Sequence, residues 1–182
     1  MLQGSLRVTR TLFCACLAAG LAGCAGMPEN MAPPPLPTAV RVPAGHRHAL
    51  TLKSTGTLNY ECRPRPGMSG AYGWVLDAPD AVLLHWSGLR VGRYYAGPTA
   101  AYRDGSSVTL KLIGSSPDEA GKLPIQLYQA VRRGGQGELS DVTYVLRLNA
   151  IGGEPDTACS VREVGSGAKT GFSADFLFYR AR

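Results

Sequence analysis

Hydrophobic and polar residues alternate along most of the chain after Pro43, a pattern that predicts β-strands. The clearest segment is 171–180, where Phe172, Phe176 and Phe178 share one face and Ser173 and Asp175 share the other. Such alternation is typical of a strand that buries one face against a second layer. Segments of this kind recur at 46–53, 55–62, 71–77, 81–86, 91–97, 107–114, 125–131, 141–150, 158–163 and 171–180.

The breaks between these segments carry residues that favour turns. Asp104-Gly105, Gly134-Gly135 and Gly152-Gly153 all tolerate turn dihedrals. Apart from the first residues and a turn near 117–120, no segment has a sustained helical period. About ten short strands predict an all-β, single-domain antiparallel β-sandwich or β-barrel, because an open sheet would leave one apolar face in water. The pattern does not choose between the two.

The first residues have the organisation of a bacterial lipoprotein signal peptide. Arg7 and Arg10 precede an uncharged apolar run, 11–23, that is too short to span a bilayer as a helix. The run ends in Leu21-Ala22-Gly23-Cys24, which resembles the lipobox. An ordinary secretory signal or a short membrane anchor would not explain that order of residues. We therefore expect residues 1–23 to be removed and Cys24 to carry the lipid.

The residue after Cys24 bears on the destination of the protein. An aspartate there favours retention in the inner membrane, and this chain has Ala25. We expect a lipid anchor in the outer membrane, with the folded domain facing the periplasm. Two or three acyl chains hold a protein far more firmly than one.

The next segment predicts a tether. Residues 24–43 are rich in proline, which favours an extended, disordered linker that separates the β domain at 44–182 from the lipid surface. A proline-rich ligand for a partner domain is the alternative interpretation.

Composition narrows the function classes. The chain is 45% hydrophobic and 18% charged, which excludes a disordered protein, and its 23 glycines and 13 prolines disfavour a helical one. The net charge of +6 falls to +4 without Arg7 and Arg10, since 17 basic and 13 acidic residues remain. These basic residues are scattered, so we expect no nucleic-acid partner, although a mild attraction to anionic lipid or polysaccharide fits.

The cysteine count indicates one disulfide. Of five cysteines, Cys14 and Cys16 lie in the signal peptide and Cys24 is expected to be acylated, which leaves Cys62 and Cys159. In an oxidising compartment two thiols on apolar faces are expected to pair, and two buried free thiols are the alternative.

The folded region resembles the domain of unknown function 3455, a family of secreted bacterial and fungal domains. The resemblance rests on Tyr60-Glu61-Cys62, 74–79, 88–92, 95–99, Asp104-Gly105-Ser106, 142–149 with Gly152-Gly153, Cys159 and 172–176. It implies the fold, secretion and the disulfide, but no activity. The chain departs from the family pattern at Tyr94, where a histidine stands in relatives, and at Ala100, where they have tryptophan.

Candidate chemistry is sparse. His46 and His48 alternate in phase with Leu50, and His85 could complete a three-histidine metal set, but spacing alone is weak and we expect no metal and no cofactor. Ser106 is interpreted as a turn residue. The acidic residues from which a glycosidase pair could be drawn are Asp77, Asp80, Asp104, Glu138 and Asp141.

The best candidate for a binding surface is the segment 94–106. Tyrosine and arginine are favoured where β proteins bind ligands, although cross-strand packing is the alternative role for these tyrosines. The candidate residues are Tyr94, Tyr95, Gly97, Pro98, Tyr102 and Asp104, with Arg93 and Arg103 around them. We therefore expect a non-catalytic binding or structural module for an envelope glycan, lipid or protein. A hydrolase acting on cell-envelope material is the alternative.

Overall fold

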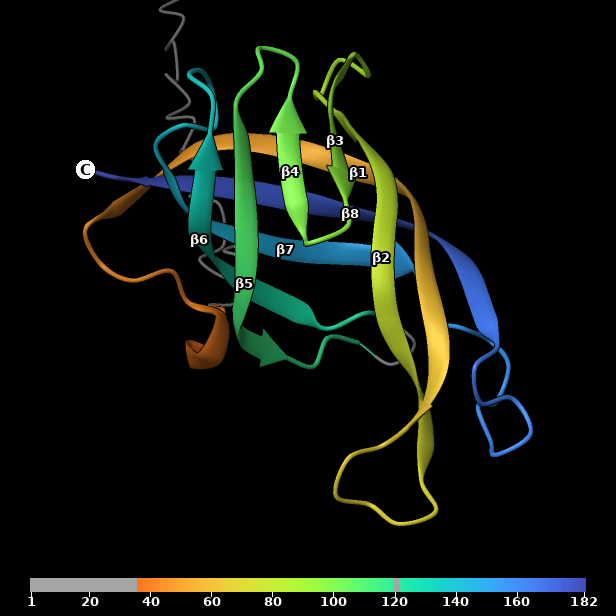
Figure 1. Cartoon of the computed structure of the whole chain (residues 1–182). Helices are drawn as coiled ribbons and strands as arrows, with labels where there is room; N and C mark the ends of the chain where they lie inside the picture. Colours follow the sequence, from red (N-terminus) through yellow and green to blue (C-terminus); the bar gives the residue numbers. More distant parts are fainter. Residues whose placement is uncertain (1–35, 120–121) are drawn as a thin grey trace, which may run out of the picture. The chain divides into compact units, whose positions relative to one another are not determined.

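The computed structural model describes residues 36–119 and 122–182. The signal peptide, Cys24 and most of the linker lie outside these residues, so the expectations about them stay predictions. The described part holds a closed barrel of eight antiparallel strands, each hydrogen-bonded to its neighbours in chain order, with β1 closing on β8 (Figure 1). The strands are β1 (His46–Pro64), β2 (Tyr72–Leu84), β3 (Arg90–Tyr95), β4 (Thr99–Tyr102), β5 (Ser107–Ser116), β6 (Ile125–Gly134), β7 (Val142–Gly152) and β8 (Gly167–Ala181), preceded by the short 3-10 helix η2 (Thr38–Val40).

The all-β prediction is confirmed and the architecture is a barrel, but the strand boundaries differ from the expected ones. Segments 46–53 and 55–62 form the single strand β1, and most of 71–77 and 81–86 forms β2, which ends at Leu84. The strand runs through the break expected at Ser54, and two residues later Gly56 marks a close approach: a β-carbon there would lie 2.3 Å from the carbonyl oxygen of Asp80. Glycine at such a position lets a barrel strand continue where its neighbour comes close.

Two further differences concern short segments. The strand β4 was not expected, because its four residues follow Gly97-Pro98 and show little alternation. Segment 158–163 is not a strand: the backbone N–H of Ser160 donates to Glu163 Oε2 at 3.0 Å, and Ser160 Oγ accepts from the N–H of Arg162 at 3.2 Å. These local side-chain bonds satisfy the backbone without a partner strand.

The barrel interior is a packed apolar core. Alternate residues of β8 point inward, so that Phe176 and Phe178 are fully buried, as is Leu52 of β1. Because the sheet curves into a closed barrel, its inner face packs against itself, and no second layer is needed to cover that face. In the described part of the chain, no helix is long and apolar enough to cross a membrane.

A second cluster lies on the outside of the barrel, where the described end of the predicted linker packs. Val40 of η2 is fully buried with Leu127 and Leu146, and Leu36 and Val42 pack at its margin. The carbonyl oxygen of Ala39 would lie 1.9 Å from a β-carbon at position 114, so Gly114 makes room for this segment. Contacts with the barrel therefore begin before residue 44.

Candidate functional site

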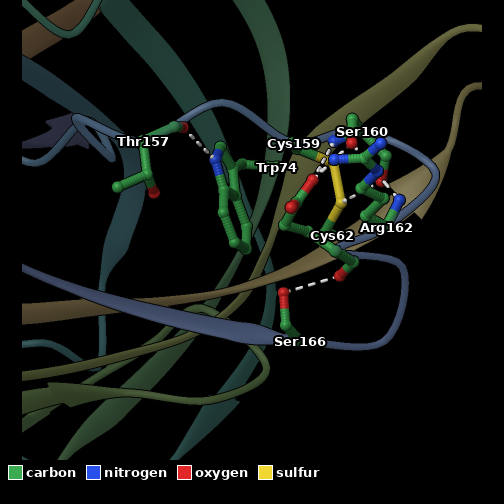
Figure 2. Close-up of a disulfide and its surroundings, with 8 residues drawn as sticks. Cys62, Trp74, Thr157, Cys159, Ser160, Arg162 and Ser166 are labelled. Atoms are coloured by element: carbon green, nitrogen blue, oxygen red, sulfur yellow. Dashed lines mark hydrogen bonds between the residues drawn. A yellow bond between two sulfur atoms is a disulfide. The ribbon is translucent and has the colours of Figure 1, made fainter.

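The predicted disulfide is present between Cys62 and Cys159. The S–S distance is 2.03 Å, the Cα atoms lie 5.6 Å apart, and the bond joins β1 to the loop between β7 and β8 (Figure 2). Beside it, the indole Nε1 of Trp74 donates to the carbonyl oxygen of Thr157 at 2.7 Å. The backbone of Cys62 also exchanges 2.9 Å hydrogen bonds with Gly165 and Ser166. This end of the barrel is therefore fastened covalently and by hydrogen bonds.

The structure separates the residues of the predicted binding surface. Tyr94 points into the barrel, is 3% exposed and packs against Phe176 with ring centroids 5.0 Å apart. Burial raises the pKa of the Tyr94 hydroxyl far above its ordinary value. Tyr94 is thus a core residue and does not contribute to a surface.

Asp104 acts as a structural clamp. Its carboxylate accepts hydrogen bonds from the hydroxyl of Ser106 at 2.6 Å, from the N–H of Ser106 at 2.8 Å and from the N–H of Glu138 at 2.6 Å. These bonds, chiefly that from the Ser106 hydroxyl, hold the pKa of Asp104 below its ordinary value. The clamp ties the β4–β5 turn to the loop before β7.

Gly97 and Pro98 form the turn between β3 and β4. Gly97 has a positive φ of 73°, and the carbonyl oxygen of Pro98 accepts a 3.0 Å hydrogen bond from the N–H of Leu110. Their roles in the structure are those of turn residues.

The other two tyrosines of the predicted surface, Tyr95 and Tyr102, line one hollow together with arginines, and we call this hollow the arginine groove. This surface hollow of about 320 Å³ lies over β3 and β4 and is lined by Arg90, Val91, Gly92, Arg93, Tyr95, Ala101, Tyr102 and Arg103. At Gly92 the two strands under the groove approach closely, because a β-carbon there would lie 2.2 Å from the carbonyl oxygen of Ala101. Arg90 was not among the expected residues, although it begins β3, the strand that carries Arg93.

The charge of the arginine groove is only partly neutralised. Arg93 lies 3.6 Å from a carboxylate oxygen of Asp80, whereas Arg90 and Arg103 form no ion pair within residues 36–119 and 122–182. The groove thus offers an apolar floor with a basic rim.

A second hollow, which we call the disulfide cleft, lies at the fastened end of the barrel. It measures about 390 Å³ and is lined by Tyr60, Arg65, Tyr72, Gly73, Trp74, Leu123, Glu154, Pro155 and Cys159. Sequence reasoning missed it because its walls come from the β1–β2 hairpin, the segment before β6 and the β7–β8 loop. Only the barrel topology brings these segments together.

The histidines do not converge as a metal set. A bulge between His48 and Leu50 reverses the alternation of β1, so that His46 packs edge-on against Tyr144 and His48 against Tyr179. His85 Nδ1 hydrogen-bonds Ser87 Oγ at 3.1 Å, and it shares a shallow hollow with His48. Among the described residues, no three His, Cys, Asp or Glu side chains are grouped so that they could hold a metal ion.

The geometry defines a small, disulfide-fastened, antiparallel barrel whose surface hollows include the arginine groove and the disulfide cleft. Within this class, the chain belongs to the family described as Protein of unknown function (DUF3455), whose model matches residues 86–180. The match runs from the β2–β3 turn into β8 and so includes the arginine groove. No curated protein and no solved structure matches the chain.

Proposed function

We propose that this protein is an outer-membrane lipoprotein whose barrel is a non-catalytic binding module for an anionic amphiphile of the cell envelope. Two features support the proposal. The order Leu21-Ala22-Gly23-Cys24 followed by Ala25 suits acylation and outer-membrane sorting. The arginine groove supplies the ligand site.

The observation that carries the binding role is the pairing of unneutralised arginines with an apolar floor. Arg90 and Arg103 are exposed and lack ion pairs among the described residues, and Tyr95 is 40% exposed beside them. A guanidinium matches phosphate or carboxylate oxygens in a bidentate geometry, while tyrosine presents a flat apolar face with a polar end. An acidic phospholipid combines the charge and the hydrocarbon that such a groove accommodates.

Two of the acidic residues considered for a hydrolase, Asp104 and Glu138, have structural partners. The carboxylate of Asp104 accepts three hydrogen bonds, and Glu138 pairs with Arg180 at 2.8 Å. No feature of the described residues favours hydrolysis over binding, so we propose the binding role alone.

The anchor is tested with Cys24→Ser in cells supplied with radiolabelled palmitate. We expect the unsubstituted protein to take up the label and to fractionate with outer membranes, and the variant to do neither. Label in the variant would show that another residue is acylated.

The binding role is tested by vesicle flotation with the full mature chain carrying Cys24→Ser, so that acyl chains do not contribute. We expect the protein to float with phosphatidylglycerol vesicles and not with phosphatidylcholine vesicles. Because each arginine near an anionic surface contributes about 1 kcal/mol, Arg90→Ala with Arg103→Ala should weaken binding roughly 30-fold.

The matched control is Arg132→Ala with Arg182→Ala, which removes the same charge from exposed positions outside the groove. Equal losses from the two double variants would show that net charge, and not the groove, attracts the vesicle. Two results together would point to a glycan ligand instead of a lipid. In the first, a soluble anionic polysaccharide displaces the protein from the vesicles; in the second, the groove variant keeps the preference for phosphatidylglycerol vesicles.

A further inference from the structure

Arg147 is a buried arginine in the interior of the barrel. It lies on β7, opposite Gln126 of β6, and is 4% exposed. Its Nη2 donates to the carbonyl oxygen of Pro124 at 3.0 Å, while its Nε has no hydrogen-bond partner. No acidic side chain of the described residues forms an ion pair with it. An unpaired buried charge is strongly unfavourable, so its presence needs an explanation.

The polar groups around Arg147 do not neutralise it. The hydroxyl of Tyr128 donates a hydrogen bond to Gln126 Oε1. The hydroxyl of Tyr60 donates to the carbonyl oxygen of Gly153 at 2.7 Å. These tyrosines are uncharged, because burial raises the pKa of each above its ordinary value even though the charge of Arg147 opposes that rise. Within the described part of the chain no carboxylate forms an ion pair with this buried charge, although the exposed Glu154 also acts on Tyr60.

The disulfide cleft lies next to this charge. Tyr60 lines the cleft and also lies within the field of Arg147. Leu123 lines the cleft too, and the carbonyl oxygen of the next residue, Pro124, accepts the hydrogen bond from the guanidinium of Arg147. Arg147 therefore lies behind the inner wall of the cleft, where a low dielectric lets its field reach an occupant.

The rim of the cleft adds a second cation and flat apolar faces. The guanidinium of Arg65 lies over Gly73, so close that a β-carbon there would come within 2.5 Å of Arg65 Nε. Tyr72 and Trp74 flank that glycine on β2, both half-buried. Trp74 is further fixed by its hydrogen bond to Thr157 (Figure 2).

We propose that the disulfide cleft binds a small planar organic carboxylate, with its carboxylate group at the inner wall in the field of Arg147 and its flat body against Tyr72 and Trp74. A cleft of about 390 Å³ suits a molecule with one or two rings. Glu154, which is exposed at the rim, disfavours dianions and sets a preference for a single negative charge. This site is separate from the arginine groove.

The probe for this proposal is benzoate, with benzyl alcohol as its uncharged counterpart, in titrations of the mature Cys24→Ser chain followed by amide chemical-shift changes. We expect saturable shifts with benzoate around Tyr60, Trp74 and Glu154, and binding of benzyl alcohol weaker by about tenfold or more. Arg147→Met should reduce benzoate affinity by about tenfold while keeping the same or a higher Tm, because it removes an unpaired buried charge.

An exposed substitution keeps the test independent of folding. Glu154→Gln should strengthen benzoate binding several-fold, whereas Asp156→Asn, an exposed acid of the same loop that does not line the cleft, should leave it unchanged. The proposal is overturned if benzoate does not saturate, if benzyl alcohol binds as tightly, or if Arg147→Met keeps the affinity of the unsubstituted protein. Equal effects of Glu154→Gln and Asp156→Asn would also overturn it.

Discussion

Asp104 and Ser106 form a clamp in which one carboxylate oxygen, Asp104 Oδ1, accepts from both the hydroxyl and the backbone N–H of Ser106. Ser106 is fully buried, and its hydroxyl oxygen also accepts a 3.0 Å hydrogen bond from the N–H of Leu139. The clamp thereby connects the β4–β5 turn with a loop that lies more than thirty residues later in the chain.

The clamp predicts a pH-dependent loss of stability. Because the pKa of folded Asp104 is below its ordinary value of 3.8, the carboxylate stabilises the fold above that pH, and this contribution disappears as pH falls through the folded pKa. Asp104→Asn should therefore lower the Tm at neutral pH, and the difference from the unsubstituted protein should shrink as the pH falls and vanish once the folded carboxyl is protonated. Asp141→Asn, at an exposed position, is the control. A difference in Tm that persists in acid would contradict the charged clamp.

The disulfide predicts a large effect on stability. It closes a loop with a sequence separation of 97 residues, and loss of such a bond costs roughly 2–5 kcal/mol. Cys62→Ala with Cys159→Ala should reduce the free energy of unfolding by that amount in urea titrations. A thiol assay on the unfolded, unreduced Cys24→Ser mature chain should find no reactive thiol. Two reactive thiols would show that the bond does not form in the cell.

The segment before β1 should detach when its contacts are removed. Val40→Ala deletes buried methyl groups and should cost about 1–2 kcal/mol. Gly114→Ala should displace the backbone of Ala39 and so accelerate tryptic cleavage after the exposed Arg41, with the barrel intact. Gly171→Ala is a matched control, because a β-carbon there would meet nothing within 4 Å. Unchanged cleavage in Gly114→Ala would mean that the segment is not held by this contact.

The buried tyrosines predict alkaline unfolding. Burial raises the pKa of Tyr94 and Tyr128, so the stability they contribute is present below the ordinary tyrosine pKa of 10.0 and is lost as pH rises above it. Phenolate absorbance should therefore rise in two stages, the second coinciding with the loss of β-sheet circular dichroism. Tyr94→Phe should move that second stage to higher pH. Full ionisation of all eight tyrosines in a folded protein would refute the assignment.

The sequence pattern predicted the strands better than their ends. Segment 171–180 lies within β8, and its inward phenylalanines are the core. The split of β1 at Ser54 was wrong, because cross-strand neighbours in β2 and β8 hold this polar stretch extended. Local signals do not contain that information.

The structure brings together only some residues of the candidate surface, because local patterns do not show which residues meet in space. Tyr95, Tyr102, Arg93 and Arg103 do line one hollow, since they are neighbours across a tight hairpin. Tyr94 was included because alternation does not say which face of a strand points inward. The disulfide cleft and the buried Arg147 depend on contacts between residues far apart in the chain, so no local pattern could indicate them.

Pairing of β1 with β8 sets an order of events during biosynthesis. The first strand acquires its second neighbour only when Gly167–Ala181 has been synthesised, so the seam is the last part of the sheet that can close. Until then one edge of β1 has no partner strand, and the barrel cannot close. A chain whose barrel closes only when synthesis is complete can still pass unfolded through a narrow protein-conducting pore, as the secretion that we propose would require.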